Sequence, residues 1–287
     1  CIPESTTGGL YRPGGVEWGR TEYQVNPFAG QMVLNKSDKA KRQSYKEFSP
    51  DDLKAIFGKD YLVHKAAKPH FYWVPLIGLF TGARINEICQ LRIDDIREFE
   101  GVWVISLLAE NPNQKAKTKA SKRIVPIHPQ LLELGLLGYV QLVAAVTGDE
   151  TSMLFPYLVK DKTGYAKSSS RQWGRYLDRL KITDEFKTFH SLRVTANNRL
   201  RQAGVDEEKR CQLVGHEHET VNSSIYSSPL EAKKLAETVL SKLQYPEVDF
   251  ASLKLDTATW EVKLKNELDR RASMESHKES RAARLSN

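Results

Sequence analysis

Two basic side chains suited to phosphate lie one helical turn apart, at His190 and Arg193. A second histidine, His216, follows a glycine, and Tyr226 comes ten residues after it. An arginine guanidinium offers a rigid fork of N–H donors that matches two phosphate oxygens. A histidine can donate a hydrogen bond or move a proton near neutral pH. A tyrosine hydroxyl can attack and hold a covalent intermediate. These residue types could therefore break a phosphodiester by nucleophilic attack.

Two further clusters carry the same chemistry. Arg84 follows a Thr-Gly-Ala turn and begins a predicted helix, with Glu87 one turn later. Glu87 could orient Arg84, or it could be an ordinary surface acid. The third cluster has five basic residues in nine and then enters a strand-like run. Its basic residues are Lys115, Lys117, Lys119, Lys122 and Arg123.

Taken together, these motifs resemble those of the tyrosine recombinases, or phage integrases, over roughly residues 46–230. The residues that carry the resemblance stand in the family's order along the chain. They are Arg84, the Lys117 region, His190, Arg193, His216 and Tyr226. One such motif would be weak evidence, but several in order are strong.

The resemblance implies a role for each of these residues. Arg84 and Arg193 would clamp the two non-bridging phosphate oxygens, where a single well-placed donor contributes about 2.7–4 kcal/mol. Tyr226 would form a 3′-phosphotyrosine link, and Lys117 would protonate the leaving 5′ oxygen, with Lys119 as the alternative. His190 and His216 would hydrogen-bond the phosphate or carry protons. We expect the remaining basic residues, Lys115, Lys122 and Arg123, to contact the DNA backbone or to be solvated.

The fold class expected is α+β, a mostly helical domain with a small antiparallel sheet. Ser49 and Pro50 predict a helix start. The apolar run 70–80 predicts a buried helix, with Pro75 near its first turn. Residues 102–108 and 123–127 read as two strands of a hairpin, so the lysines lie in its loop. Further helices are expected over 128–146 and 168–180, then around Leu192–Leu200, between Asp206 and Gly215, and beyond Tyr226.

We expect three regions along the chain. Residues 1–45 read as a leader or linker, which could be the tail of a truncated N-terminal DNA-binding domain. Residues 46–245 would form the catalytic domain. Residues 246–287 would form a helical or flexible tail, whose charged part from Glu261 to Asn287 reads as a frayed solvated helix rather than as an arm that binds a partner.

The composition is that of an ordinary globular protein of 287 residues, with a net charge of +7 that suits a polyanion such as DNA. No apolar run is long enough to span a membrane, and no signal peptide is visible. Cys89 and Cys211 read as small core residues of a reducing cytoplasm. We therefore expect a cytoplasmic, nucleoid-associated bacterial protein. His216 and His218 could form a metal pair, but no third ligand has suitable spacing, so no metal or cofactor is expected.

The function expected is site-specific recombination of double-stranded DNA for a phage or other mobile element. The resemblance implies a homotetramer on DNA and a monomer off it, with accessory DNA-bending or directionality proteins as further partners. A type IB topoisomerase or a hairpin telomere resolvase would share the chemistry. A non-catalytic DNA-binding regulator on the same scaffold remains an alternative. A nuclease using His and Lys would not need Tyr226.

Overall fold

The chain divides into two units, Cys1–Gln43 and Ser44–Asn287, and everything described below lies in the second. The computed structural model describes residues 45–116, 118, 121–215 and 231–285. The helices that carry the argument are α2 (Pro50–Ile56), α3 (Asp60–Lys65), α4 (Pro69–Thr81), α5 (Ile85–Cys89), α6 (Pro129–Glu133), α7 (Leu136–Thr147), α8 (Lys167–Arg179), α9 (His190–Gln202), α10 (Glu207–Val214), α12 (Ala232–Thr238) and α13 (Thr257–Leu285). The strands are β1 (Ile96–Phe99), β2 (Val102–Ser106) and β3 (Ile124–Pro126).

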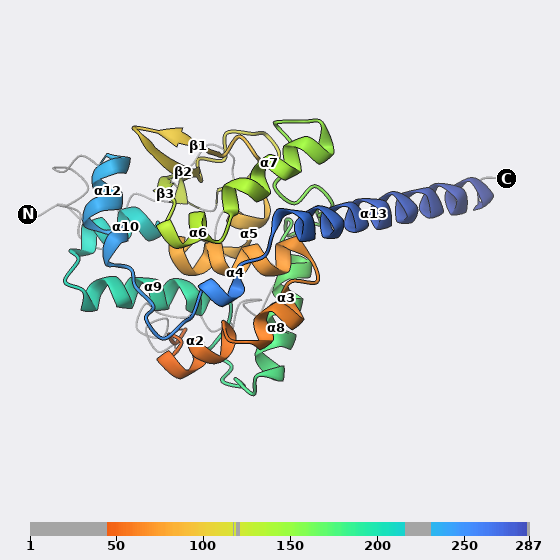
Figure 1. Ribbon diagram of the computed structural model, residues 1–287. Coiled ribbons are helices and arrows are strands. Elements are labelled where there is room, and N and C mark those ends of the chain that lie inside the picture. The colour runs from red at the N-terminus through yellow and green to blue at the C-terminus, as the bar shows by residue number, and fades with distance from the viewer. Residues whose placement is uncertain (1–44, 117, 119–120, 216–230, 286–287) are drawn as a thin grey trace, which may run out of the picture. The chain divides into compact units, whose positions relative to one another are not determined.

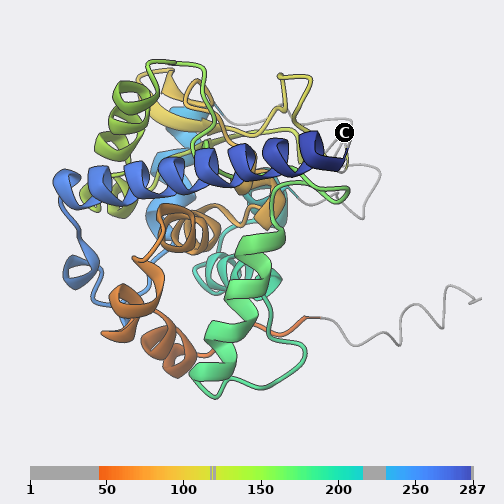
Figure 2. The same cartoon turned by 90° about the vertical axis from the view of Figure 1, so that its right-hand side faces the viewer.

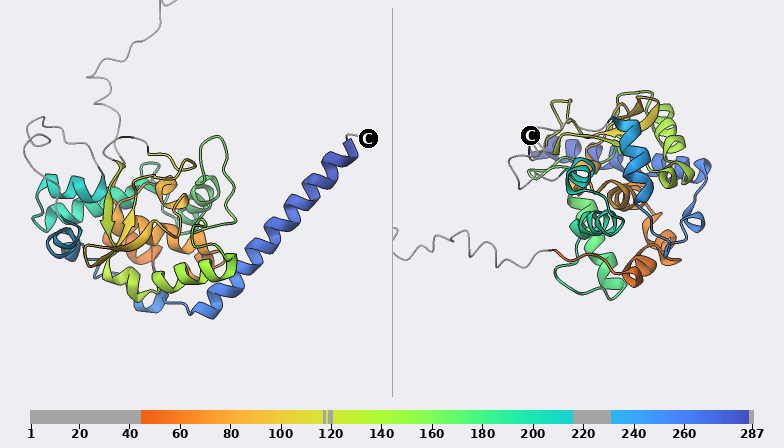
Figure 3. Two further views of the ribbon diagram at one scale, coloured as in Figure 1. Left: turned by 90° about the horizontal axis from the view of Figure 1, so that it is seen from above. Right: turned by 90° about the vertical axis from the view of Figure 1, so that its left-hand side faces the viewer.

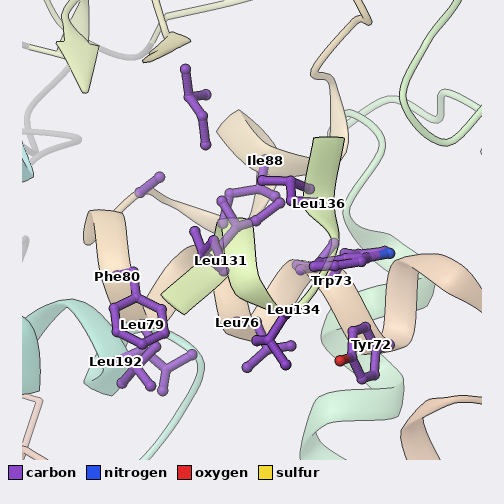
Figure 4. Packing of buried hydrophobic residues seen from close by; sticks show 14 of the residues in the cluster. Tyr72, Trp73, Leu76, Leu79, Phe80, Ile88, Leu131, Leu134, Leu136 and Leu192 are labelled. Carbon is purple, nitrogen blue, oxygen red and sulfur yellow. The ribbon is translucent and has the colours of Figure 1, made fainter. Parts of the chain in front are cut away.

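Helix α4 is the centre of the hydrophobic core. All of its residues except Phe71 are buried, because the segment is apolar on every face rather than along one stripe. It contacts α3, α5, α6, α8, α9 and α13, and it runs between the sheet and α9 in two perpendicular views (Figures 1 and 2). Figure 4 shows Leu79 and Phe80 of α4 near Leu192 of α9. Helix α4 is therefore packed against other elements along its length, and its C-terminal end lies against α9.

Pro75 does not lie near the first turn of its helix, as the sequence had led us to expect. The helix begins at Pro69, so Pro75 is its seventh residue and lies in the interior. A proline there removes one backbone hydrogen bond and costs about 3 kcal/mol. The helix continues through it because its neighbours Val74 and Leu76 are buried in the core.

The sheet is small and antiparallel, with strand order β1-β2-β3. The predicted hairpin is confirmed: Ile105 of β2 pairs with Val125 of β3. Strand β1, which the sequence analysis did not identify, pairs along the other edge of β2. Helix α12 packs against β2 and β3. The α+β class, mostly helical with a small antiparallel sheet, is confirmed.

Local signals account for the predicted helix boundaries. Ser49 accepts a hydrogen bond from the Asp52 amide and Asp52 from the Ser49 amide, which forms a reciprocal cap on α2. Helices α4 and α10 end at Gly82 and Gly215, both in the left-handed conformation that glycine adopts without strain. These two glycine turns recur below, because both lie at the candidate site.

The C-terminal residues form one long helix, α13. Its first turns are anchored: Trp260 is 2% exposed, and its ring centroid lies 4.8 Å from that of Tyr72. Lys68 and Glu267 add an ion pair at 2.5 Å. Residues 272–282 are exposed, and this end of the helix extends away from the other described elements (Figures 1 and 3). Among the helices of the described ranges, none is long and apolar enough to cross a bilayer.

We expect Trp260→Ala to lower the free energy of unfolding by about 3–5 kcal/mol, since it leaves a cavity in the aromatic cluster around α4. The matched control is Val262→Ala in the same helix, where the side chain is 60% exposed and the change should stay within about 0.5 kcal/mol. Urea denaturation of the full chain measures both. Equal losses in the two variants would show that α13 is not anchored by its tryptophan.

Candidate active site

Arg84 stands at the turn between the central helix and α5. Gly82 ends α4 in the left-handed conformation, and the Thr81 hydroxyl accepts a hydrogen bond from the Ala83 amide at 3.1 Å. A side chain at Gly82 would meet Val214 at 2.8 Å, so this turn also allows α10 to approach closely. Arg84 is then the N-cap residue of α5 and is half-buried.

Glu87 orients Arg84. Its Oε1 accepts a hydrogen bond from Arg84 Nη1 at 2.7 Å, and its Oε2 accepts one from the Arg84 amide at 3.0 Å. Glu87 is only 6% exposed, so it is not an ordinary surface acid. Burial alone would raise the pKa of Glu87, but the charges of Arg123 and Arg84 and the hydrogen bonds from Arg84 hold it below its ordinary value. The carboxylate is therefore ionised beside the guanidinium.

The lysine-bearing hairpin loop is attached to this same corner. Arg84 Nη1 also donates to the Ser121 hydroxyl at 2.7 Å, and that hydroxyl lies 3.0 Å from the Thr118 hydroxyl. On the other side of the loop, the Lys115 amide donates to the Gln90 side chain at 3.0 Å, and the Gln90 amide group donates back to the Lys115 carbonyl. Both flanks of the segment that contains Lys117 are thus held near Arg84. Lys117 and Lys119 themselves lie outside the described residues.

Arg193 lies on α9, one turn after His190, and is 1% exposed. Its Nη1 donates to the Gly82 carbonyl at 2.8 Å and to the Val214 carbonyl, and its Nη2 donates to the Gly215 carbonyl at 2.8 Å. These bonds join α9 to the ends of α4 and α10. Burial and, after it, the nearby charges of Arg123 and Arg84 together lower the pKa of Arg193 to about 9. The group stays protonated at neutral pH.

His190 is the first residue of α9 and is half-buried. Its amide donates to the Thr188 hydroxyl at 3.2 Å, and its ring lies 4.8 Å from the ring of Tyr45. The other two predicted site residues, His216 and Tyr226, lie outside the described residues. Helix α10 ends at Gly215, directly before His216.

Arg123 and Ser121 are the residues at this site that the sequence analysis missed. The expectation that Arg123 is a solvated loop residue or a contact to the DNA backbone is wrong: it is 7% exposed and pairs with Glu87 at 3.4 Å. Strand periodicity contained the signal, because Arg123 shares its parity with the buried Val125 and Ile127. Nothing in the sequence pointed to Ser121.

The described part of the site is strongly positive. The guanidinium groups of Arg84, Arg123 and Arg193 lie close together, with Glu87 as the carboxylate among them: the charges of Arg84 and Arg123 lower the pKa of Arg193, and the charge of Arg84 lowers that of Arg123. A cavity of about 370 Å³ opens beside Arg84 and is also lined by Lys115, Lys160 and Lys162, with Glu87 and Asp161 as the carboxylates of its lining. Such an arrangement can bind an anion and stabilise negative charge that develops on it. Among the described residues, no group of three or more His, Cys, Asp or Glu side chains is placed to hold a metal ion.

A family model described as the phage integrase family matches residues 47–232. The chain belongs to this family. The match covers about two thirds of the chain and includes every candidate residue from Arg84 to Tyr226. The protein is therefore a tyrosine recombinase that carries the integrase catalytic domain, an enzyme class that performs site-specific DNA recombination.

Solved structures of the Tn1549 transposon integrase also match this recombinase. One is a complex with transposon right end DNA, which is 20% identical, has a TM-score of 0.42, and covers 69% of this chain and 67% of that one. A second is a complex with a circular intermediate DNA, again 20% identical, with a TM-score of 0.43 and coverage of 69% and 66%. A comparison with curated protein sequences gives no match.

We expect Glu87→Gln to lower the free energy of unfolding at pH 7 by about 3 kcal/mol, because it leaves buried guanidinium groups without their carboxylate. The folded-state pKa of Glu87 is lowered, so its stabilisation is present above the ordinary value of 4.5 and is lost as the pH falls further. The difference between wild type and variant should therefore shrink in acid. Urea denaturation at pH 7 and below pH 4 measures it.

The control for this prediction is Glu98→Gln, at an exposed carboxylate on β1. It should change stability by less than about 0.5 kcal/mol at either pH. A loss in Glu87→Gln that stayed constant into acid would contradict the ion-pair origin of the effect.

Proposed function

We propose that this recombinase cuts and rejoins double-stranded DNA through a 3′-phosphotyrosine intermediate, and that it serves a phage or another mobile element. The observation that carries the proposal is the cluster of the half-buried Arg84 with the buried Glu87, Arg123 and Arg193 beside a lysine-lined cavity, in a chain of the phage integrase family. A cation cluster held in place before substrate arrives favours negative charge on a bound phosphate.

In the proposed reaction, the Tyr226 hydroxyl oxygen attacks the phosphorus of a DNA phosphodiester and gives its proton to His190 or His216. The bond between phosphorus and the 5′ oxygen breaks, and Lys117 gives its proton to that oxygen. Arg84 and Arg193 hold the two non-bridging oxygens, while His190 and His216 hydrogen-bond the phosphate or carry protons. A 5′ hydroxyl of the partner strand then attacks the phosphotyrosine and releases Tyr226. The covalent link keeps the bond energy, so the cycle needs no external energy source.

The wider assembly is part of the same proposal. The recombinase would act as a homotetramer on two DNA sites and as a monomer off DNA, together with accessory DNA-bending or directionality proteins. It would act on nucleoid DNA in the bacterial cytoplasm. Residues 1–45 would be a leader or linker, residues 46–245 the catalytic domain and residues 246–287 a tail that contains α13.

The nucleophile can be tested with suicide DNA substrates, nicked so that cleavage is trapped, prepared from the flanks of the host element. We expect wild type to give a covalent protein–DNA band on a denaturing gel, and Tyr226→Phe to give none. Tyr45→Phe is the control, because Tyr45 is 50% exposed and has no proposed role in the chemistry. Specific DNA binding without a covalent band would instead support the non-catalytic regulator.

The general acid can be tested with DNA in which sulfur replaces the bridging 5′ oxygen. A thiolate leaving group needs no proton, because its pKa is far below that of an alcohol. We expect Lys117→Ala to slow cleavage of ordinary DNA by about 10²–10⁴-fold and to cleave the sulfur substrate at nearly the wild-type rate.

Two matched variants complete the general-acid test. Lys119→Ala should cleave both substrates like wild type, and Arg84→Ala should stay slow on both, since it lacks charge stabilisation rather than a proton. If Lys119→Ala, and not Lys117→Ala, cleaved ordinary DNA slowly and the sulfur substrate at nearly the wild-type rate, the general acid would be Lys119.

A further inference from the structure

Arg123 lies just before β3, and its guanidinium is closed off from solvent. Its Nε donates to the Leu213 carbonyl of α10 at 2.8 Å. Its Nη1 donates to the Ser121 carbonyl at 2.9 Å and approaches Glu87 Oε2 at 3.4 Å. One side chain thus bridges the hairpin, α10 and the carboxylate that orients Arg84.

Packing alone does not explain an arginine at this position. Its Nη2 is buried and has no hydrogen-bond partner among the residues that the structure describes, which costs about 1–3 kcal/mol. Burial and the charge of Arg84 lower the pKa of Arg123 to about 10, although Glu87 opposes them. An apolar side chain beside Val125 would avoid both costs. The Arg123 guanidinium, with its several donors and its charge, therefore points to a role other than packing in the core.

The carbonyls at the end of α10 show what the fork does. Three successive carbonyls there accept hydrogen bonds from two arginines: Leu213 from Arg123, then Val214 and Gly215 from Arg193. A helix C-terminus carries partial negative charge and unsatisfied carbonyls, so cations stabilise it. Together the two arginines set the position from which the chain continues to His216.

We propose that Arg123 is a positioning residue, which couples the Glu87–Arg84 pair to the end of α10. It thereby fixes the position of Arg84 relative to the residue from which the chain continues to His216. In this proposal its fork serves protein partners, the Leu213 and Ser121 carbonyls and Glu87, rather than the phosphate. The reaction that this positioning serves is the proposed function above, so the test includes a readout that does not depend on cleavage.

The first readout is single-turnover formation of the covalent link on the suicide substrate. Arg123→Met keeps much of the side-chain volume without the fork, and Arg123→Lys keeps the charge, but its single nitrogen cannot reach both Leu213 and Glu87. We expect both to react about 10–100-fold more slowly, with DNA affinity within about threefold of wild type. Arg97→Met, at a half-exposed arginine of β1, is the control and should react like wild type.

The second readout is the pH dependence of that rate. Because ionised Glu87 orients Arg84, we expect the rate to fall in acid as Glu87 is protonated, which gives the acid limb of the profile. Arg123 is the strongest charge that lowers the pKa of Glu87, so Arg123→Met should raise that pKa and move the acid limb to higher pH. Arg123→Lys should restore the acid limb while its rate stays low. A merely structural loss would scale the whole profile without moving the limb, and that result would overturn the proposal.

The third readout is hydrogen exchange of the full chain without DNA. In Arg123→Met, we expect amides of residues 207–215 to exchange on the order of tenfold faster, and amides of residues 136–147 in α7 to be unchanged. No change at 207–215, or an equal increase in both segments, would overturn the positioning role. If wild type formed no covalent link on any DNA end, the proposed function would fail, and exchange would still decide the role of Arg123.

Discussion

Three guanidinium groups share one small region of this recombinase, and their mutual repulsion constrains the structure around them. Glu87 is the carboxylate among Arg84, Arg123 and Arg193, and it is itself nearly buried. Backbone carbonyls supply the remaining compensation: those of Gly82, Ser121, Leu213, Val214 and Gly215 all accept hydrogen bonds from Arg123 or Arg193. Buried charge is tolerated only when it is paired and hydrogen-bonded. The site therefore depends on where the chain can present carbonyls.

The fold presents them at helix ends. The central helix α4 and helix α10 both end at glycines in the left-handed conformation, so their last carbonyls point out of the helices and toward the arginines. The absence of a side chain at Gly82 lets Val214 approach. Because α4 is packed on nearly every face, its end is a fixed point to which α5, α9 and α10 are tied. The apolar core and the cation cluster are thus parts of one arrangement.

The cation cluster is ordered before DNA binds, and this favours catalysis at a phosphate. A chain that held the same arginines on flexible surface loops would have to order them when DNA bound, at an entropic cost. Here Arg84 and Arg193 are ordered by protein partners beforehand, and the surrounding core offsets the cost of burying their charge. Preorganised positive charge is what a phosphoryl-transfer site requires. The lysine-bearing loop is attached to the same corner through Ser121 and Gln90, so the described flanks of the proposed general acid share the anchor.

Local patterns in the sequence determined the start of α2, the ends of α4 and α10, the β2–β3 hairpin and the α+β class, because caps, glycine stops and hydrophobic periodicity act over a few residues. The order of the motifs also identified the phage integrase family. The contacts of Arg123 with Leu213 and of Ser121 with Arg84, the anchoring of α13 by Trp260, and the interior place of Pro75 were decided only by the tertiary structure. Each of these depends on residues far apart in the chain, or on burial that outweighs a local preference. Sequence could indicate an arginine facing inward at position 123, but not which carbonyls and which carboxylate it would meet.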